Sequence, residues 1–219
     1  PQARSDVQRL RAESSAVLTG IGTIIADDAA LTVRPEQFDV QRFEGDVSVD
    51  DEEGFDGVLL DEVVQSQPLR VVMDSKARMP ANSKILETKS PIVWVVSEEI
   101  SFDSNQAAIA NCAYIDVLRL PKVSSEESLR QVLKYLASLG CNEVLVEAGS
   151  ILAGSFIETD LWDELIVYMA PKLLGSRAKP LLNLPIDSML DAKSISLKDV
   201  RQFGDDIRFI YQPAQDESN

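Results

Sequence analysis

The chain has 219 residues, 45% of them hydrophobic, a formal net charge of −15 and no histidine. The absence of histidine excludes a Ser-His-Asp triad, a histidine-ligated zinc and an imidazole base, and the negative charge argues against nucleic acid as a partner. No apolar run reaches the ~20 residues that a bilayer demands and the N-terminus lacks the regions of a signal peptide, so we expect a cytoplasmic protein with one main domain and no membrane segment.

The first elements alternate between helix and strand. Residue spacing predicts a helix over Gln2–Glu13, a short strand at Ala16–Thr19 and a second, shorter helix at Thr23–Asp27. An acidic segment then interrupts the chain, because Glu44–Glu62 contains nine Asp and Glu residues and no Lys or Arg. We expect a solvated loop insertion at about 36–67, and an acidic docking site for a basic partner is the less favoured alternative.

Buried strands and an amphipathic helix follow the insertion. β-Branched runs at Arg70–Met73, Ile92–Val96 and Ile115–Leu118 are typical of buried strands. The helix over Glu126–Leu139 is expected to end at Gly140 in a left-handed C-terminal cap.

The next strand and helix meet at a glycine. Val144–Val146 has the pattern of a strand and Ile151–Glu158 that of a helix, with Glu147 and Gly149 at the junction between them. The start of a helix presents unpaired N–H groups and the positive end of the helix dipole, so this junction is a natural seat for a phosphate. An ordinary strand–turn–helix without a ligand is the alternative interpretation of the same residues.

The end of the chain consists of predicted strands. Glu164–Met169, Ile195–Val200 and Ile207–Tyr211 have strand patterns, and Gly204 lies in the short connection Gln202–Asp206. We therefore predict an α/β fold of three layers, with a mainly parallel sheet, helices on both of its faces and a C-terminal antiparallel hairpin. Dihydrofolate reductase and its relatives have this arrangement.

Four ordered segments resemble one protein family. The run from Thr19 to Arg34, Thr-Gly-Ile-Gly-Thr-Ile-Ile-Ala-Asp-Asp-Ala-Ala-Leu-Thr-Val-Arg, resembles the Ala-Asp-Asp-Pro-x-Leu-Thr-x-Arg signature of the reductase domain of the bifunctional riboflavin-biosynthesis deaminase/reductase. Val72-Met-Asp-Ser75, Val146-Glu-Ala-Gly149 and the run from Asp163 to Gly175 resemble further blocks of that domain, in the same order. The resemblance covers nearly the whole chain outside the acidic insertion.

The resemblance implies a reduction by NADPH of 5-amino-6-(5-phosphoribosylamino)uracil to the ribitylamino product of riboflavin biosynthesis, with hydride passing to the sugar C1′. It implies a cofactor site made of Thr23, Asp27, Ser75, Gly149, Ser150, Ile151, Leu152, Ala153, Gly154 and Ser155. It implies a substrate site made of Arg11, Leu31, Arg34 and Glu147.

The chemistry of the side chains bears on these implied roles. Arg11 and Arg34 each carry a planar fork of donors that can hold a phosphate, although either one alone is typical of a surface charge. Because histidine is absent, Glu147 and Asp27 are the candidate catalytic groups, which would stabilise a protonated open-chain imine or relay a proton. A turn or capping role is the alternative for Asp27.

Other expectations concern domain organisation. In relatives a first strand and a Trp-Ile-Thr-Ser stretch precede the segment that begins here at Pro1, so we expect a single reductase domain, residues 1–219, truncated at its N-terminus and exposing a sheet edge. The zinc ligands of a deaminase do not occur, and Cys112 and Cys141 are typical of reduced thiols, so we expect no deaminase domain and no metal. The apolar segment Glu164–Leu174 suits a homodimer interface, as the resemblance suggests, or a buried central strand.

Two other functions remain as alternatives. A dihydrofolate-reductase-like enzyme that acts on another pteridine or pyrimidine would share the fold and the cofactor. A non-catalytic acidic domain that binds a flavin or nucleotide, or docks a partner, fits the charge but leaves the four ordered segments unexplained.

Overall fold

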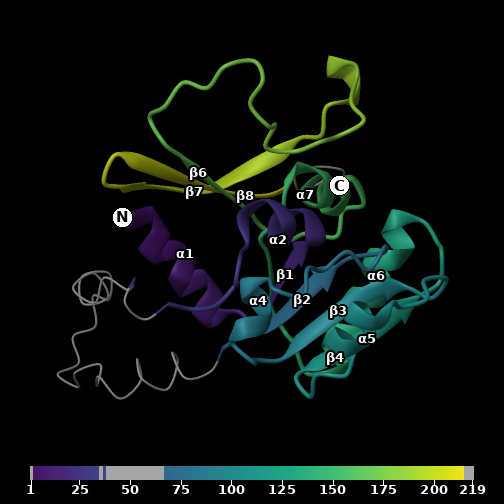
Figure 1. Cartoon of the computed structure of the whole chain (residues 1–219). Coiled ribbons are helices and arrows are strands. Elements are labelled where there is room, and N and C mark those ends of the chain that lie inside the picture. The colour runs from purple at the N-terminus through teal and green to yellow at the C-terminus, as the bar shows by residue number, and fades with distance from the viewer. Residues whose placement is uncertain (1, 35–36, 38–66, 215–219) are drawn as a thin grey trace.

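The computed structural model describes residues 2–34, 37 and 67–214 (Figure 1). Apart from residues 37 and 67, the expected insertion at 36–67 lies outside the described residues, so its solvated character stays a prediction. Within the described ranges, no helix has the length and apolar character needed to cross a bilayer.

A five-stranded parallel sheet forms the centre of the fold, in the order β4-β3-β2-β1-β5. Its strands are β1 (Ala16–Gly20), β2 (Leu69–Met73), β3 (Ile92–Ser97), β4 (Ile115–Leu120) and β5 (Val144–Val146). Every pairing in this sheet is parallel, which places the carboxyl ends of the strands along one edge. The strands expected at these positions are confirmed, with small differences in their bounds.

Helices cover both faces of this sheet (Figure 1), so the predicted three layers are confirmed. Neighbouring residues of β1 point to opposite faces, as in any strand. Val17 packs in a core with α2 and α5, whereas Leu18 packs in a core with α6 and α7. The helices are α1 (Gln2–Glu13), α2 (Ile21–Asp27), α4 (Lys84–Glu87), α5 (Ser104–Ala110), α6 (Ser125–Ser138) and α7 (Ser150–Glu158).

Helix α6 ends as predicted before Gly140, which adopts a positive φ of 83°. The N–H of Cys141 donates to the carbonyl of Leu136, and the N–H of Gly140 donates to that of Ala137, each at 3.0 Å. This pair of bonds is the Schellman arrangement, which needs a left-handed residue after the cap. A Cβ added at Gly140 would meet open space, so the backbone angle alone favours glycine there.

The change Gly140→Ala is expected to lower the free energy of unfolding by about 1 kcal/mol, because a residue with a Cβ resists the left-handed conformation. Urea denaturation followed by circular dichroism measures this loss. Gly22→Ala is the control, since Gly22 lies inside α2 and an added Cβ there also meets open space. Alanine favours a helix interior, so this control should be at least as stable as the wild type, and equal losses in both variants would contradict the argument.

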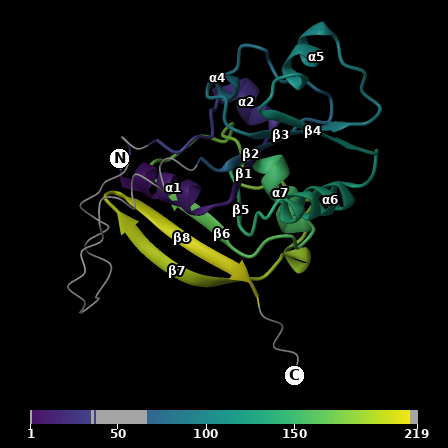
Figure 2. The same ribbon diagram turned by 90° about the horizontal axis from the view of Figure 1, so that it is seen from below.

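The last three strands form a separate antiparallel sheet in the order β6-β8-β7. β6 (Leu165–Met169) pairs with β8 (Asp206–Pro213), and β8 pairs with β7 (Ile195–Phe203) across a turn at Gly204, whose φ is 68°. The predicted hairpin is confirmed, and β6 adds a third strand to it. Figure 2 shows this sheet apart from the parallel one.

β5 and β6 each have one unpaired edge within the described part of the chain, since β5 pairs with β1 and β6 with β8. β6 is therefore an edge strand there, half-buried from Leu165 to Tyr168, rather than a buried central one. It ends at Met169 instead of reaching Leu174, because Pro171 has no N–H to offer a strand ladder. A missing first strand and a homodimer interface stay predictions.

Candidate active site

Neighbouring strands deliver the predicted cofactor residues to one edge of the parallel sheet. β1 leads into α2, which carries Thr23 and Asp27, β2 is followed by Ser75, and β5 is followed by α7. β1 lies between β2 and β5, and adjacent strands are about 4.8 Å apart. The topology thus groups these segments where open α/β sheets bind their ligands.

The first turn of α7 is open to a ligand. Its N-cap is Gly149, with φ −70° and ψ 168°, and no side chain caps the helix. A Cβ added at Gly149 would meet nothing within 4 Å, and Ile151 is 72% exposed. The turn therefore presents helix N–H groups to open space, which suits the phosphate of a dinucleotide.

Glu147 and Arg11 form an ion pair between the end of β5 and α1. Arg11 donates from Nε to Oε1 of Glu147 at 2.5 Å and from Nη2 to Oε2 at 2.7 Å. Its Nη1 donates to the carbonyl of Thr32 at 2.9 Å. Two predicted substrate residues are thus brought together, and the bidentate fork holds the carboxylate in one orientation.

The other two predicted substrate residues differ in their surroundings. Leu31 is 2% exposed, packs in the core beside α2 and has a positive φ of 56°. Arg34 is exposed, and its N–H donates to Oε1 of Gln8 at 2.8 Å. That bond fixes the backbone from which the Arg34 guanidinium projects.

Asp27 is the last residue of α2 and is exposed. The capping role left open for Asp27 belongs to Asp28, which adopts φ 47° and donates its N–H to the carbonyl of Ile24. The Asp28 carboxylate also accepts the N–H of Lys84 at 2.9 Å. The helix end therefore does not depend on the Asp27 carboxylate.

Asp74, the residue before Ser75, is a buried carboxylate whose contacts were not predicted from the sequence. Asp74 is 1% exposed, and its Oδ2 accepts the N–H of Met79 at 2.9 Å and the Nε1–H of Trp94 at 3.1 Å. These bonds fix the turn that carries Ser75. The signal was present in the sequence, because a buried strand that ends on a carboxylate must satisfy that carboxylate.

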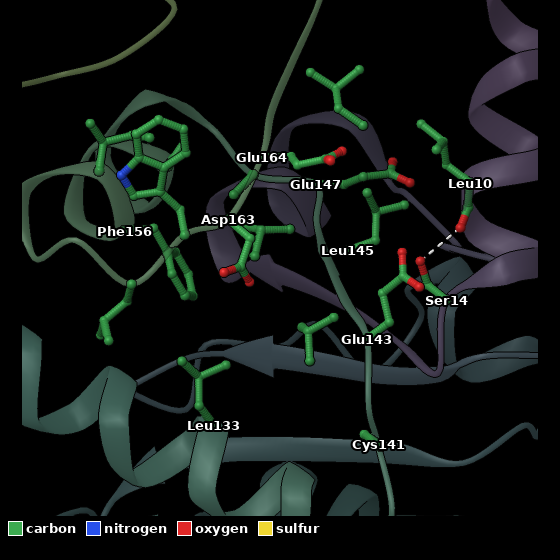
Figure 3. A pocket seen from close by; sticks show the side chains of 18 of the residues that line it. Leu10, Ser14, Leu133, Cys141, Glu143, Leu145, Glu147, Phe156, Asp163 and Glu164 are labelled. Atoms are coloured by element: carbon green, nitrogen blue, oxygen red, sulfur yellow. Dashed lines mark hydrogen bonds between the residues drawn. The ribbon is translucent and has the colours of Figure 1, made fainter. Parts of the chain in front are cut away.

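A cavity of about 800 Å³ lies between α1, α7 and the facing strands β5 and β6 (Figure 3). Among the described residues, its lining includes four carboxylates and no Lys or Arg: Glu143, Glu147, Asp163 and Glu164. The body of the cavity therefore disfavours anions, and a phosphate is better placed outside it. No group of three or more Cys, Asp or Glu side chains in the described ranges is arranged to hold a metal ion.

Buried charges hold α1 against the C-terminal sheet beside this cavity. Asp6 Oδ2 and Arg208 Nη1 are 2.7 Å apart, and both side chains are 5% exposed. Tyr168, which lines the cavity, donates its hydroxyl to Asp6. Burial and this bond raise the pKa of Tyr168, so its hydroxyl stays a donor at neutral pH. The cluster anchors the helix that carries Arg11.

Residues 1–209 match the family described as the RibD C-terminal domain. The chain belongs to the RibD C-terminal domain family. This match confirms the resemblance drawn from the four sequence segments.

Three relatives show the extent of the similarity. RibD of Haemophilus influenzae is 37% identical over 214 residues, which cover 97% of this chain and 51% of that protein. The 5-amino-6-(5-phosphoribosylamino)uracil reductase of Buchnera aphidicola subsp. Acyrthosiphon pisum is 33% identical over 97% of this chain and 93% of that protein. The structure of Acinetobacter baumannii RibD (form 2) matches with a TM-score of 0.72 at 32% identity, over 97% of this chain and 51% of that chain. The chain thus spans about half the length of RibD.

Proposed function

We propose that this RibD C-terminal domain reduces 5-amino-6-(5-phosphoribosylamino)uracil to the ribitylamino product, with NADPH as the cofactor and in the cytoplasm. The observation that carries the proposal is the similarity to the Buchnera reductase, over 97% of this chain and 93% of that protein. The open first turn of α7 and the neighbouring Glu147–Arg11 pair support a dinucleotide bound next to a reducible sugar.

The residues at the sheet edge fit this cofactor. Gly149 leaves open space where a side chain would stand, and the uncapped turn after it offers backbone donors for a phosphate. Ser75 and Thr23 add hydroxyls from the neighbouring segments. A bound NADPH supplies the hydride, and the chain supplies binding, orientation and charge.

The side chains of the substrate side have distinct proposed roles. The exposed Arg34 guanidinium binds the substrate phosphate through charge-assisted hydrogen bonds. Glu147, fixed by Arg11, faces the sugar and stabilises the positive charge of its protonated open-chain imine. Asp27 is the second carboxylate proposed for this charge or for a proton relay.

Arg34→Ala is expected to raise the KM for the phosphorylated substrate by roughly 10- to 100-fold and to leave kcat nearly unchanged, because a hydrogen bond to a charged group contributes about 1.5–3 kcal/mol. Steady-state assays that follow the loss of NADPH absorbance measure both constants. Arg130→Ala is the control, since Arg130 lies on α6 in an exposed pair with Glu126. An unchanged KM in the Arg34 variant would remove that residue from the phosphate site.

Nucleotide titrations separate this function from its alternatives. Saturable binding of NADPH supports a reductase, whereas binding of a flavin, or of no nucleotide, supports the non-catalytic alternative. Turnover of the phosphoribosylaminouracil, compared with dihydrofolate and other pyrimidines, then distinguishes the proposed reaction from another dihydrofolate-reductase-like activity. Absence of turnover with NADPH bound would reject the proposed substrate.

We also propose that the domain forms a homodimer through the segment Glu164–Leu174. Met169 is 52% exposed, Leu173 104% and Leu174 78%, an unusual concentration of exposed apolar side chains. Sedimentation equilibrium tests the proposal, because a monomer mass at micromolar concentration would contradict it.

A further inference from the structure

The loop between β6 and β7 lies against the start of α7. The N–H of Asn183 donates to the carbonyl of Ser150 at 3.0 Å. A Cβ added at Gly154 would lie 2.2 Å from the carbonyl oxygen of Asn183, closer than any real Cβ contact. The loop backbone and the helix therefore touch at a place where only glycine fits, and Figure 1 shows the loop passing above α7.

The same loop is fastened at the other end of α7. Lys193 donates from Nζ to the carbonyls of Ile157 at 2.9 Å and Glu158 at 3.0 Å, and it pairs with Asp160 at 2.7 Å. A lysine at these carbonyls complements the negative end of the helix dipole. The loop thus follows α7 from its first turn to its last.

Part of this loop is basic in an otherwise acidic chain. Residues 171–183, which we name the basic strap, contain Lys172, Arg177 and Lys179 and no Asp or Glu, although the whole chain has a net charge of −15. All three cations are exposed, and none has an ion-pair partner among the contacts of the described residues. The hydrogen bond from Asn183 to the carbonyl of Ser150 joins the end of this positive segment to the first turn of α7.

We propose that Gly154 is a positioning residue, whose missing side chain lets the basic strap dock on the first turn of α7 and complete the anion site of that turn. The inference rests on the proposed function, because the anion in question is a phosphate of the dinucleotide. The strap adds full positive charges to the partial charge of the helix start. Gly154 acts through the strap and need not touch the cofactor.

Two variants undo the docking from opposite sides. Gly154→Ala places a methyl group against the Asn183 carbonyl and displaces the strap. Asn183→Pro removes the N–H that donates to Ser150 and leaves α7 itself unaltered. Both variants are expected to weaken NADPH binding by about tenfold, because each loses about one charge-assisted contact with the cofactor. Fluorescence titration measures the dissociation constant. Asn183→Ala keeps the N–H donor and is the matched comparison for the proline variant.

Limited trypsin digestion provides a second readout. Lys172, Arg177 and Lys179 are cleavage sites within the strap, so mass spectrometry can follow its release directly. We expect faster cleavage at these sites in both docking variants than in the wild type, and protection by NADPH in the wild type alone. Gly22→Ala is the control, since a Cβ added there meets nothing within 4 Å.

The outcomes separate docking, cofactor binding and general destabilisation. Wild-type NADPH affinity in both docking variants would overturn the proposal, and so would an affinity loss in Gly154→Ala that Asn183→Pro does not reproduce. An unchanged melting temperature with weaker NADPH binding would support a positioning role over a merely structural one. If the wild-type chain bound no NADPH, the proposed function would fail, while the digestion rates would still decide whether Gly154 docks the strap.

Discussion

Asp6→Asn is expected to lower the free energy of unfolding by about 3–5 kcal/mol, because it breaks a buried ion pair and leaves the charge of Arg208 without its main partner. Asp6 and Arg208 are joined at 2.7 Å with both side chains 5% exposed. The same carboxylate accepts hydrogen bonds from Arg9 and Tyr168. An amide at this position keeps the shape of the side chain but cannot replace its charge.

The stability contribution of Asp6 should also depend on pH. Burial by itself raises the pKa of the Asp6 carboxyl, but hydrogen bonds from Tyr168 and Arg208 outweigh it and hold that pKa below its usual value of 3.8. A group with a lowered pKa in the folded state stabilises the protein fully above its unfolded pKa and loses this effect as the pH falls through its folded pKa. The difference in stability between the wild type and the variant should therefore shrink below about pH 4.

Guanidinium denaturation at neutral pH and again near pH 3 measures both effects. Glu126→Gln is the control, because it removes a carboxylate from an exposed pair with Arg130 and should cost less than about 1 kcal/mol. A second test combines Asp6→Leu with Arg208→Met, which removes both charges and should recover part of the loss. If Asp6→Asn unfolded at the same guanidinium concentration as the wild type, the buried ion pair would make no net contribution to the free energy of unfolding.

Much of the fold could be predicted from local patterns in the sequence. The apolar spacing of α6 and the glycine after it predicted a helix and a left-handed cap, because both depend on residues close in sequence. The strand, turn and helix from Val144 to Glu158 were predicted for the same reason. The alternation of buried strands and helices was enough to give the three layers.

Contacts between residues that are far apart in the chain could not be predicted from the sequence. Asp6 and Arg208 are 202 positions apart, and each is charged, so nothing in the pattern of α1 or β8 distinguishes them from surface residues. Arg70 was predicted within a buried strand, but not that its guanidinium would be fully buried among backbone carbonyls, including that of Ile85 at 2.6 Å.

The residues of the candidate site stay predictions, whereas the structure shows contacts between them that the sequence could not predict. The resemblance named Arg11 and Glu147, whereas their mutual ion pair depends on how α1 crosses the end of β5. Gly154 was assigned to the cofactor by its place in a motif, and the structure adds the strap that covers it. Leu31 was expected to face the substrate, which stays a prediction, and the structure places its side chain in the core.

Glu147→Gln is expected to lower kcat by roughly 10²- to 10⁴-fold, the range for loss of a positioned acid–base or charge-stabilising group. Glutamine matches the size of glutamate and still accepts one hydrogen bond from Arg11, but it neither carries a negative charge nor exchanges a proton. The loss should therefore appear in kcat, while the dissociation constant for NADPH stays close to that of the wild type, because the phosphate donors after Gly149 are backbone groups.

The control for this change is Glu126→Gln, which alters an exposed carboxylate on α6, outside the lining of the cavity. Asp27→Asn completes the series, since the cap of α2 is provided by Asp28 and the variant should fold normally. If Glu147 acts on the developing charge and Asp27 relays a proton, each single variant slows turnover. Wild-type turnover in both would mean that neither of these two carboxylates contributes to the reduction, and would favour orientation of the two reactants by the sheet edge as the source of the rate.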